Sequence, residues 1–332
     1  MAKVLVAGGA GYVGAHACLR LREKGHEVVI YDDLSSGHLA FVQGGPFIRG
    51  DIRDRERLNA AFETVQPDAV MHFAARIEVG WSMTHAAECF DVNVGGSAAL
   101  IDACVRHGVK AMVFSSTCAV YGDPQTPALR ESHQVRPISP YGRSKAIVES
   151  MLEEVEMRGG LRSARLRYFN AAGADPRARI GEAHEPETHL IPLILQVAAG
   201  QRDAISVFGN SYSTRDGTAV RDYVHVCDLA DAHVLALEAL LAGERGFVAN
   251  LGSETGYTVR EVIKACERVT GQPIKQIAAE RRFGDAPSLI ADAAFAHRTL
   301  GWTPGRDLDT IIEDAWRWEQ SRGDQTCWSK VG

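Results

Sequence analysis

The sequence predicts an α/β protein with a doubly wound parallel sheet and a smaller α/β lobe toward the C-terminus. Three observations lead to this fold class. Short apolar runs alternate with segments of helical length through the first half of the chain. A glycine-rich turn follows the first run, and polar residues follow later runs where the strands should end. This alternation is typical of βαβ units, whose parallel strands end at one edge of the sheet.

The composition is that of an ordinary globular protein. The 332 residues are 45% hydrophobic, enough to bury the cores of two lobes. A net charge of −6, with no long run of Lys or Arg, argues against nucleic-acid and membrane-surface partners. We also expect no signal peptide or membrane span, because Lys3 leads directly into the first short apolar run.

The cysteines indicate a reducing compartment. Their number is seven, which is odd, and they form no Cys-x-x-Cys pair. Reduced thiols and a cytoplasmic location are therefore expected. No zinc-ligand spacing is found among Cys and His, so no metal is expected.

The predicted elements follow one another in the order that a parallel sheet requires. The buried strands are expected at Val4–Ala7, Val28–Tyr31, Ala69–Phe73, Ala111–Ser115 and Ala164–Tyr168. Helical segments between or after them are expected at Val13–Lys24, Cys89–His107 and Tyr141–Arg158.

The second lobe is expected to interleave with the first. After Asn170 the chain becomes rich in Gly, Pro, His and Glu, with no clear strand up to Pro192. Residues 1–170 are therefore predicted to form a dinucleotide-binding domain. Arg221–Val226 and Val248–Leu251 look like strands, so the chain should return to that domain at about 221–252. Residues 171–220 and 253–332 would then form the substrate lobe.

The first turn carries a dinucleotide-binding pattern of the Rossmann type. Gly8, Gly11 and Gly14 lie between the first strand and the first helix. Glycines at these positions permit a tight turn and let backbone N–H groups approach a pyrophosphate at the helix N-terminus. Asp32 and Asp33 end the second strand, where a carboxylate accepts hydrogen bonds from ribose hydroxyls and repels a 2′-phosphate. NAD is therefore favoured over NADP.

Other candidate cofactor contacts follow later strands. Asp51 and Ile52 could lie near the adenine, or could belong to a surface turn. The small residues of Phe73-Ala74-Ala75 could make room where the cofactor crosses the sheet, or could serve packing alone. Asn93 could support the active-site strand, or could satisfy a helix backbone.

Tyr141 and Lys145 are the strongest catalytic candidates. They are four residues apart and so share one face of a helix. An ammonium nearby favours the phenolate and should lower the tyrosine pKa, and a bound cationic nicotinamide should lower it further. Ser115 and Thr117 close the preceding strand, so their hydroxyls should point into the crevice where such sheets bind ligands.

Together, the glycine pattern, the hydroxyl-bearing strand and Tyr-x-x-x-Lys resemble the extended short-chain dehydrogenase/reductase superfamily. Further motifs are similar to those of nucleotide-sugar epimerases, and most similar to the UDP-glucose (UDP-galactose) 4-epimerase family, from Lys3 to about Trp318. The motifs are Tyr168-Phe-Asn170, His189-Leu-Ile-Pro192, Val207-Phe-Gly209, Asp216-Gly-Thr-Ala-Val-Arg-Asp-Tyr-Val-His225, Asp228-Leu-Ala-Asp231 and Arg281-Arg-Phe-Gly-Asp285.

This resemblance implies specific parts for individual residues. Tyr141 would be the base, Thr117 its hydroxyl partner, and Lys145 the residue that holds the nicotinamide ribose and lowers the tyrosine pKa. Additional NAD contacts would come from Tyr12, Val13, Ser115 and Tyr168. The UDP-sugar substrate would be held by Asn170, Leu190, Phe208, Arg221, Arg282, Asp285 and Leu289, along with Thr117 and Tyr141. The resemblance also implies a homodimer whose two subunits are joined by a four-helix bundle.

Three positions depart from the family pattern. Arg76-Ile77 stands where some members carry a lysine, and His189 stands where some have asparagine. Leu289 occupies a position that gates the sugar pocket in family members, where tyrosine is associated with exclusion of N-acetylated sugars. Leucine leaves more room than tyrosine.

The resemblance implies reversible 4-epimerisation of UDP-glucose and UDP-galactose through a 4-keto sugar, with transient hydride transfer to NAD. Related dehydratases and decarboxylases carry an acid beside the catalytic hydroxyl, whereas Thr117 is followed by Cys118 and Ala119. A UDP-N-acetylhexosamine or UDP-pentose 4-epimerase remains an alternative on the same scaffold. A non-catalytic NAD-sensing regulator is an alternative of another class, and the presence of Tyr141 and Lys145 argues against it.

Overall fold

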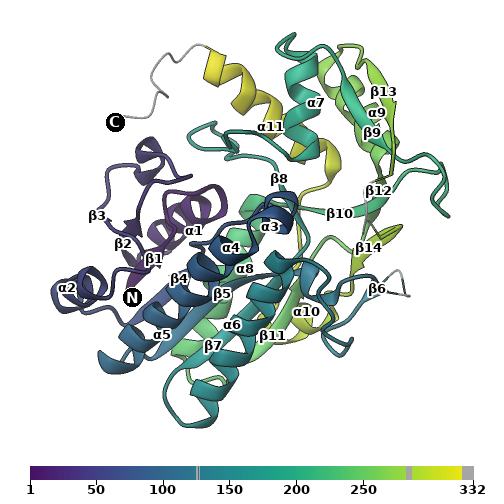
Figure 1. The fold of residues 1–332 in the computed structure, drawn as a ribbon. Helices are drawn as coiled ribbons and strands as arrows, with labels where there is room; N and C mark the ends of the chain where they lie inside the picture. The colour runs from purple at the N-terminus through teal and green to yellow at the C-terminus, as the bar shows by residue number, and fades with distance from the viewer. Residues whose placement is uncertain (125, 127, 282–285, 324–332) are drawn as a thin grey trace.

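The computed structural model describes residues 1–124, 126, 128–281 and 286–323. Their central feature is a seven-stranded parallel sheet (Figure 1). Its strands, from one edge to the other, are β3 (Phe47–Arg49), β2 (Glu27–Asp32), β1 (Lys3–Ala7), β4 (Ala69–His72), β5 (Ala111–Thr117), β7 (Arg162–Tyr168) and β11 (Phe247–Leu251). All five strands expected from apolar runs lie in this sheet, which confirms the predicted fold class.

Helices cover both faces of the sheet because the strands are apolar on both sides. One face packs against α1 (Tyr12–Glu23), α8 (Val226–Leu241) and α10 (Ala294–Leu300). The other packs against α2 (Arg55–Val65), α5 (Ser97–Arg106) and α6 (Pro140–Met157). Among the described residues, no helix combines the length and apolar character needed to cross a bilayer.

The predicted helix at Cys89–His107 is divided. It consists of α4 (Ala86–Phe90), a π-helical turn η2 (Asp91–Gly96) and α5, and it is preceded by α3 (Val79–Thr84). The wider π turn contains Asn93, whose side chain binds the backbone of the loop after β4. Hydrophobic periodicity does not reveal this turn, because it reports which face is buried rather than which backbone carbonyl accepts each bond.

Within the described residues, the second lobe contains two small sheets and three helices. One sheet has the order β12 (Gly256–Thr258), β10 (Val220–His225), β14 (Ser288–Ala291) and β6 (Ala128–Leu129), with β8 (Asn170–Ala172) also paired to β10. The other sheet pairs β13 (Gln276–Ala279) with β9 (Ile205–Phe208). The helices are α7 (Leu190–Ala198), α9 (Val259–Thr270) and α11 (Leu308–Gly323), which lie with β9 and β13 at the top of Figure 1.

The expected return of the chain to the first sheet is wrong in one detail. The strand predicted at Arg221–Val226 is β10, which joins the smaller sheet, and only β11 joins the large one. In addition, α10 packs on α8 and β11 in the core of the first lobe, although it lies within 253–332. Composition can indicate that a segment forms a strand, but it cannot show which strand it pairs with. The hydrogen bonds between strands join backbone groups, which nearly every residue carries.

The carboxyl ends of four neighbouring strands bring the predicted functional residues together. Gly8 follows β1, Phe73 follows β4, and Thr117 and Tyr168 end β5 and β7. Parallel pairing places Thr117 opposite Tyr168 in the ladder. Residues far apart in sequence therefore line one edge of the sheet, facing the smaller lobe.

A buried ion pair fixes α6 to this edge. The Arg167 guanidinium on β7 donates to Glu149 on α6 with an Nη2 to Oε2 distance of 2.5 Å, and both side chains are almost fully buried. The Ser116 hydroxyl donates to the same carboxylate at 2.5 Å. Because Tyr141 and Lys145 lie on α6, this pair sets their distance from β5.

Replacing Glu149 by alanine should therefore destabilise the protein strongly. The change leaves the Arg167 charge buried without its carboxylate, which typically costs about 3–5 kcal/mol. Denaturant titration of both proteins measures the difference. Glu154→Ala is the matched control on the same helix, because its side chain is 60% exposed and pairs at 3.2 Å with Arg158, which is 79% exposed, so the expected change is below about 1 kcal/mol. Equal effects of the two substitutions would contradict this account of α6.

Candidate active site

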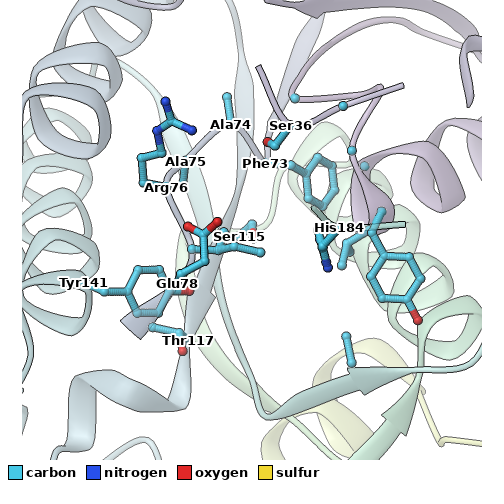
Figure 2. A pocket seen from close by; sticks show the side chains of 18 of the residues that line it. Ser36, Phe73, Ala74, Ala75, Arg76, Glu78, Ser115, Thr117, Tyr141 and His184 are labelled. Atoms are coloured by element: carbon cyan, nitrogen blue, oxygen red, sulfur yellow. The ribbon is translucent and has the colours of Figure 1, made fainter. Parts of the chain in front are cut away.

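A cavity of about 410 Å³ opens at the carboxyl edge of the sheet, between the two lobes (Figure 2). Most of the predicted site residues line it. They are Gly8, Gly11, Tyr12, Val13, Gly14, Asp32, Asp33, Asp51, Ile52, Phe73, Ala74, Ala75, Ser115, Thr117, Tyr141, Lys145, Tyr168, Asn170, Leu190 and Leu289. The structure thus brings the cofactor and catalytic candidates into one continuous space.

The glycine turn is packed too closely for larger residues. Gly8 has a φ of +80°, and a Cβ added there would lie 2.4 Å from the backbone nitrogen of Ala74. A Cβ on Gly14 would lie 2.1 Å from the carbonyl oxygen of Gly8. The N-cap of α1 is Gly11, so no side chain caps the first backbone N–H groups. They are free to bind a pyrophosphate, as a dinucleotide site requires.

The acidic residues after β2 and β3 are held by local hydrogen bonds. Asp32 is buried, and its two carboxylate oxygens accept from the backbone N–H groups of Ala10 and Leu34 at 3.0 and 2.9 Å. Each oxygen keeps a further lone pair for a ribose hydroxyl. Asp51 instead forms a bidentate pair with Arg53, whose Nη2 lies 2.5 Å from Oδ2. Its carboxylate is therefore engaged, although the residue lines the cavity.

Asn93 connects the loop after β4 with α6. Its Oδ1 accepts from the Arg76 backbone N–H at 2.7 Å, and its Nδ2 donates to the Arg76 carbonyl at 3.0 Å and to Ser144 Oγ at 2.9 Å. The side chain is buried and does not line the cavity. Asn93 therefore supports the site from behind, through the loop after β4 and α6 rather than through the active-site strand, and it is not placed as a cofactor contact.

The catalytic candidates share one wall. Figure 2 shows the Tyr141 ring beside Thr117, with Ser115 nearby. The Lys145 ammonium is buried, donates to the Ser115 carbonyl at 2.8 Å, and lies 4.8 Å from the centre of the Phe114 ring. The Ser115 hydroxyl lies 2.6 Å from the Tyr168 hydroxyl. Lys145, Tyr141 and Thr117 thus line the cavity from α6 and β5.

The expected effect of Lys145 on Tyr141 is corrected by the structure. Burial, the largest cause, raises the pKa of Tyr141 above its ordinary value, and Tyr168 raises it further. Only the hydrogen bond with the Thr117 hydroxyl lowers it appreciably. Burial also lowers the pKa of Lys145 to about 8. The spacing correctly places both residues on one face, but desolvation outweighs the attraction that the sequence argument considered.

The predicted substrate residues fall into three groups: those that line the cavity, those that do not, and those outside the described residues. Asn170, Leu190 and Leu289 line the cavity, and the Asn170 side chain donates to the Asp222 carbonyl at 2.9 Å. Arg221 and Phe208 are not among the lining residues that the structure describes. The Arg221 guanidinium donates to the carbonyls of Val220 and Ala286. Arg282 and Asp285 lie outside the described residues.

Two of the departures from the family pattern have defined surroundings. The Arg76 guanidinium lies 5.7 Å from the centre of the Trp81 ring and 3.6 Å from the Glu88 carboxylate, so it faces α3 and α4. His189 contacts the Glu182 carboxylate through Nδ1 and lines the cavity. Ile77 also lines the cavity and is 37% exposed.

Sequence reasoning missed several residues of the cavity wall. Ser35, Ser36 and Gly37 come one residue after the acidic pair, beyond Leu34, and this run of small residues could have indicated them. Glu182 and His184 come from the segment before Pro192 in which no clear strand was expected. Their signal is the alternation of Glu and His from 182 to 189, which a search restricted to Cys and His overlooks.

Comparison with known proteins identifies the family. A profile of the NAD dependent epimerase/dehydratase family matches residues 4–252. The chain belongs to this family. It is 51% identical over 319 residues to a UDP-glucose 4-epimerase of Rhizobium meliloti (strain 1021), covering 96% of this chain and 97% of the relative. The resemblance predicted from the motifs is thus confirmed.

Solved structures of the family agree. A UDP-glucose 4-epimerase from Stenotrophomonas maltophila, with bound NAD and formylated UDP-arabinopyranose, has a TM-score of 0.95 and 42% identity, covering 98% of this chain and 99% of that one. A UDP-Glc/GlcNAc 4-epimerase from Campylobacter jejuni has a TM-score of 0.85 and 38% identity, covering 97% of this chain and 100% of that one. The family fold therefore extends over nearly the whole chain.

Gly14→Ala should reduce NAD binding. The added Cβ would collide with the Gly8 carbonyl, and the turn must shift at a typical cost of about 1–3 kcal/mol. Quantifying NAD released from the purified protein, and NAD affinity after its removal, measures the loss. Gly80→Ala is the matched control, since a Cβ there meets nothing within 4 Å. Unchanged NAD binding by Gly14→Ala would refute the packing argument.

Proposed function

We propose that this chain catalyses the reversible 4-epimerisation of UDP-glucose and UDP-galactose, with NAD bound along the glycine-lined part of the cavity. The observation that carries this proposal is the shared wall of Thr117, Tyr141 and Lys145 beside that part of the cavity. The uncapped start of α1 and the contact between Gly8 and Ala74 fit a dinucleotide. When bound, NAD supplies a reversible acceptor for hydride from the fourth carbon of the sugar.

Tyr141 is proposed to move the proton of the sugar 4-hydroxyl. The Thr117 hydroxyl is its hydrogen-bonding neighbour and favours the phenolate. Because the protein's own groups raise the pKa of Tyr141, a cationic nicotinamide is needed to bring it toward the working range. Tyr141 then acts as base while the 4-keto sugar forms, and as acid when the proton returns after the sugar has turned.

Lys145 is proposed to hold the nicotinamide ribose while its ammonium remains bonded to Ser115. An ammonium has three donors, and the Ser115 carbonyl uses one of them. The remaining donors can reach a ribose hydroxyl on the cavity side. The absence of an acid at Cys118 and Ala119 favours epimerisation over dehydration, since loss of water needs a further proton donor.

The UDP portion is proposed to bind the smaller lobe through Asn170, Leu190, Phe208, Arg221, Arg282 and Asp285. An arginine fork suits a diphosphate because it can bind two phosphate oxygens at once. The Arg221 guanidinium donates to the backbone carbonyls of Val220 and Ala286, which helps to fix its position. On this proposal, residues 1–170 and 226–252 with α10 bind NAD, and the rest of the chain grips the UDP.

The family's homodimer and a cytoplasmic location complete the proposal. Ile147 and Met157 on α6 and Val105 on α5 are 41%, 68% and 43% exposed, and apolar side chains on two neighbouring helices suit a four-helix interface. The cysteines among the described residues are all free thiols, which suits a reducing compartment.

Tyr141→Phe tests the chemistry. Loss of the phenol should lower kcat for UDP-galactose by a factor on the order of 10²–10⁴, because general acid–base groups contribute about that much. NAD should remain bound to the variant. A non-catalytic NAD-sensing regulator would also bind NAD, so the turnover rate is the measurement that distinguishes an enzyme from a regulator. Tyr257→Phe is the matched control, since Tyr257 lies in β12 away from the cavity. Full activity of Tyr141→Phe would exclude this tyrosine as the base.

Leu289→Tyr tests the range of sugars. Leu289 lines the cavity, so a larger ring there should leave less room beside the sugar. We expect kcat/KM for UDP-N-acetylgalactosamine to fall at least about tenfold more than kcat/KM for UDP-galactose, within the range that pocket contacts provide. Both proteins are assayed with these two sugars and UDP-xylose. Equal losses on all three sugars would reject Leu289 as the gate, and no turnover of UDP-galactose by the unchanged protein would reject the hexose assignment.

A further inference from the structure

Four side chains of one short segment converge beside the active-site cavity. They form the Glu/His cluster, which consists of Glu182, His184, Glu187 and His189. Each contributes one ligand atom, and these atoms all lie within 4.8 Å of one another. Three members also line the cavity, and Figure 2 shows His184 on the side opposite Tyr141.

The distances within the cluster resemble those of a metal-ligand tetrahedron. His184 Nδ1 lies 3.2 Å from Glu182 Oε1 and 3.7 Å from Glu187 Oε1. His189 Nδ1 lies 4.0 Å from Glu187 Oε1 and is in direct contact with Glu182 Oε1. Bonds of about 2.0–2.2 Å from one zinc ion give ligand–ligand edges of about 3.3–3.6 Å. Small side-chain rotations would therefore place all four atoms around a single ion.

Burial distinguishes the cluster from ordinary surface acids. The side chains of Glu182 and Glu187 are only 5% and 6% exposed, and that of His184 is 18% exposed. His184 Nδ1 is inaccessible to solvent and lacks a hydrogen bond of good geometry. Two adjacent buried carboxylates need a compensating positive charge. Two protonated imidazoles supply this charge in the metal-free protein, and a divalent cation with two neutral imidazoles would replace them without changing the net charge of the cluster.

The surrounding structure holds the segment in this shape. The Trp318 indole N–H donates to the Glu182 carbonyl at 2.8 Å, and His38 Nε2 lies 2.7 Å from the Ala183 carbonyl. The backbone N–H groups of Thr188 and His189 donate to Glu187 Oε1 at 2.7 and 2.9 Å. Contacts from the loop after β2 and from α11 thus hold the segment that carries the four ligand atoms.

We propose that the Glu/His cluster binds one divalent metal ion of zinc's class. Two imidazole nitrogens and two carboxylate oxygens suit Zn²⁺, which accepts both in a tetrahedral arrangement. With four protein ligands the site is closed, so the ion is structural rather than catalytic. It ties the 182–189 segment to the start of α7, where Leu190 forms part of the cavity wall. The expectation of no metal, which rested on Cys and His spacing alone, left the glutamates out of account.

Metal binding by tag-free protein, stripped with a chelator and desalted, tests this site independently of epimerase activity. One equivalent of Zn²⁺ should remain after renewed desalting, as measured by elemental analysis. Co²⁺ should give the intense visible absorption of a tetrahedral site without a thiolate charge-transfer band, because no cysteine takes part. Zn²⁺ in excess should also raise Tm by about 2 °C or more, since it binds only the folded state.

Substitution identifies the ligands. The double variant His184→Gln/His189→Gln should bind Co²⁺ at least about 100-fold more weakly. Loss of a residue that only hydrogen-bonds to a metal ligand typically costs about 10–100-fold. His107→Gln is the matched control, an exposed histidine outside the cluster, and should bind Co²⁺ as the unchanged protein does.

Three results would overturn the proposal. They are substoichiometric metal in the unchanged protein, a thiolate band in its Co²⁺ spectrum, and undiminished binding by the double variant. If the double variant does not fold, the spectrum and stoichiometry of the unchanged protein decide the matter.

Discussion

The attachment of α6 to the ends of β5 and β7 is the constraint on which the rest of the site depends. This helix presents Tyr141, Lys145 and Glu149 at successive four-residue intervals toward the sheet. Glu149 is fixed by the buried Arg167 guanidinium, and Lys145 by the Ser115 carbonyl. Both groups are charged and almost inaccessible, so each must keep its partner. Tyr141 carries no charge to be compensated, and its side chain is hydrogen-bonded to Thr117, so its place depends on that bond and on the two residues behind it.

This arrangement has an electrostatic consequence. Burial favours the neutral forms of both Tyr141 and Lys145, which raises one pKa and lowers the other. A protein that used Lys145 alone to ionise Tyr141 would need a direct contact between them, whereas the ammonium is bonded to Ser115. In the proposed mechanism, a phenol whose pKa is raised by burial suits a cofactor-dependent reaction, because it would act as the base only when the cationic cofactor is bound.

The segment from 182 to 189 is organised on the opposite side of the cavity. It is tied to α11 through Trp318, and its last residue precedes α7. Its two carboxylates are as buried as the ion pair below α6, whereas its two imidazoles are more exposed, and the four groups lie within eight residues of one another in the sequence. The cavity therefore lies between two polar supports, one built from the strands of the large sheet and one built from a loop of the smaller lobe.

The sequence by itself determined the parallel sheet, the glycine turn and the membership of the family, which the comparisons confirm. These features depend on local patterns, namely apolar runs, glycine spacing and motifs that lie within a few residues. Tertiary structure alone decided that β10 joins the smaller sheet, that Asn93 supports Arg76 and Ser144, and that burial governs the pKa of Tyr141. Pairing, long-range hydrogen bonds and desolvation depend on neighbours distant in sequence, so no local pattern could report them.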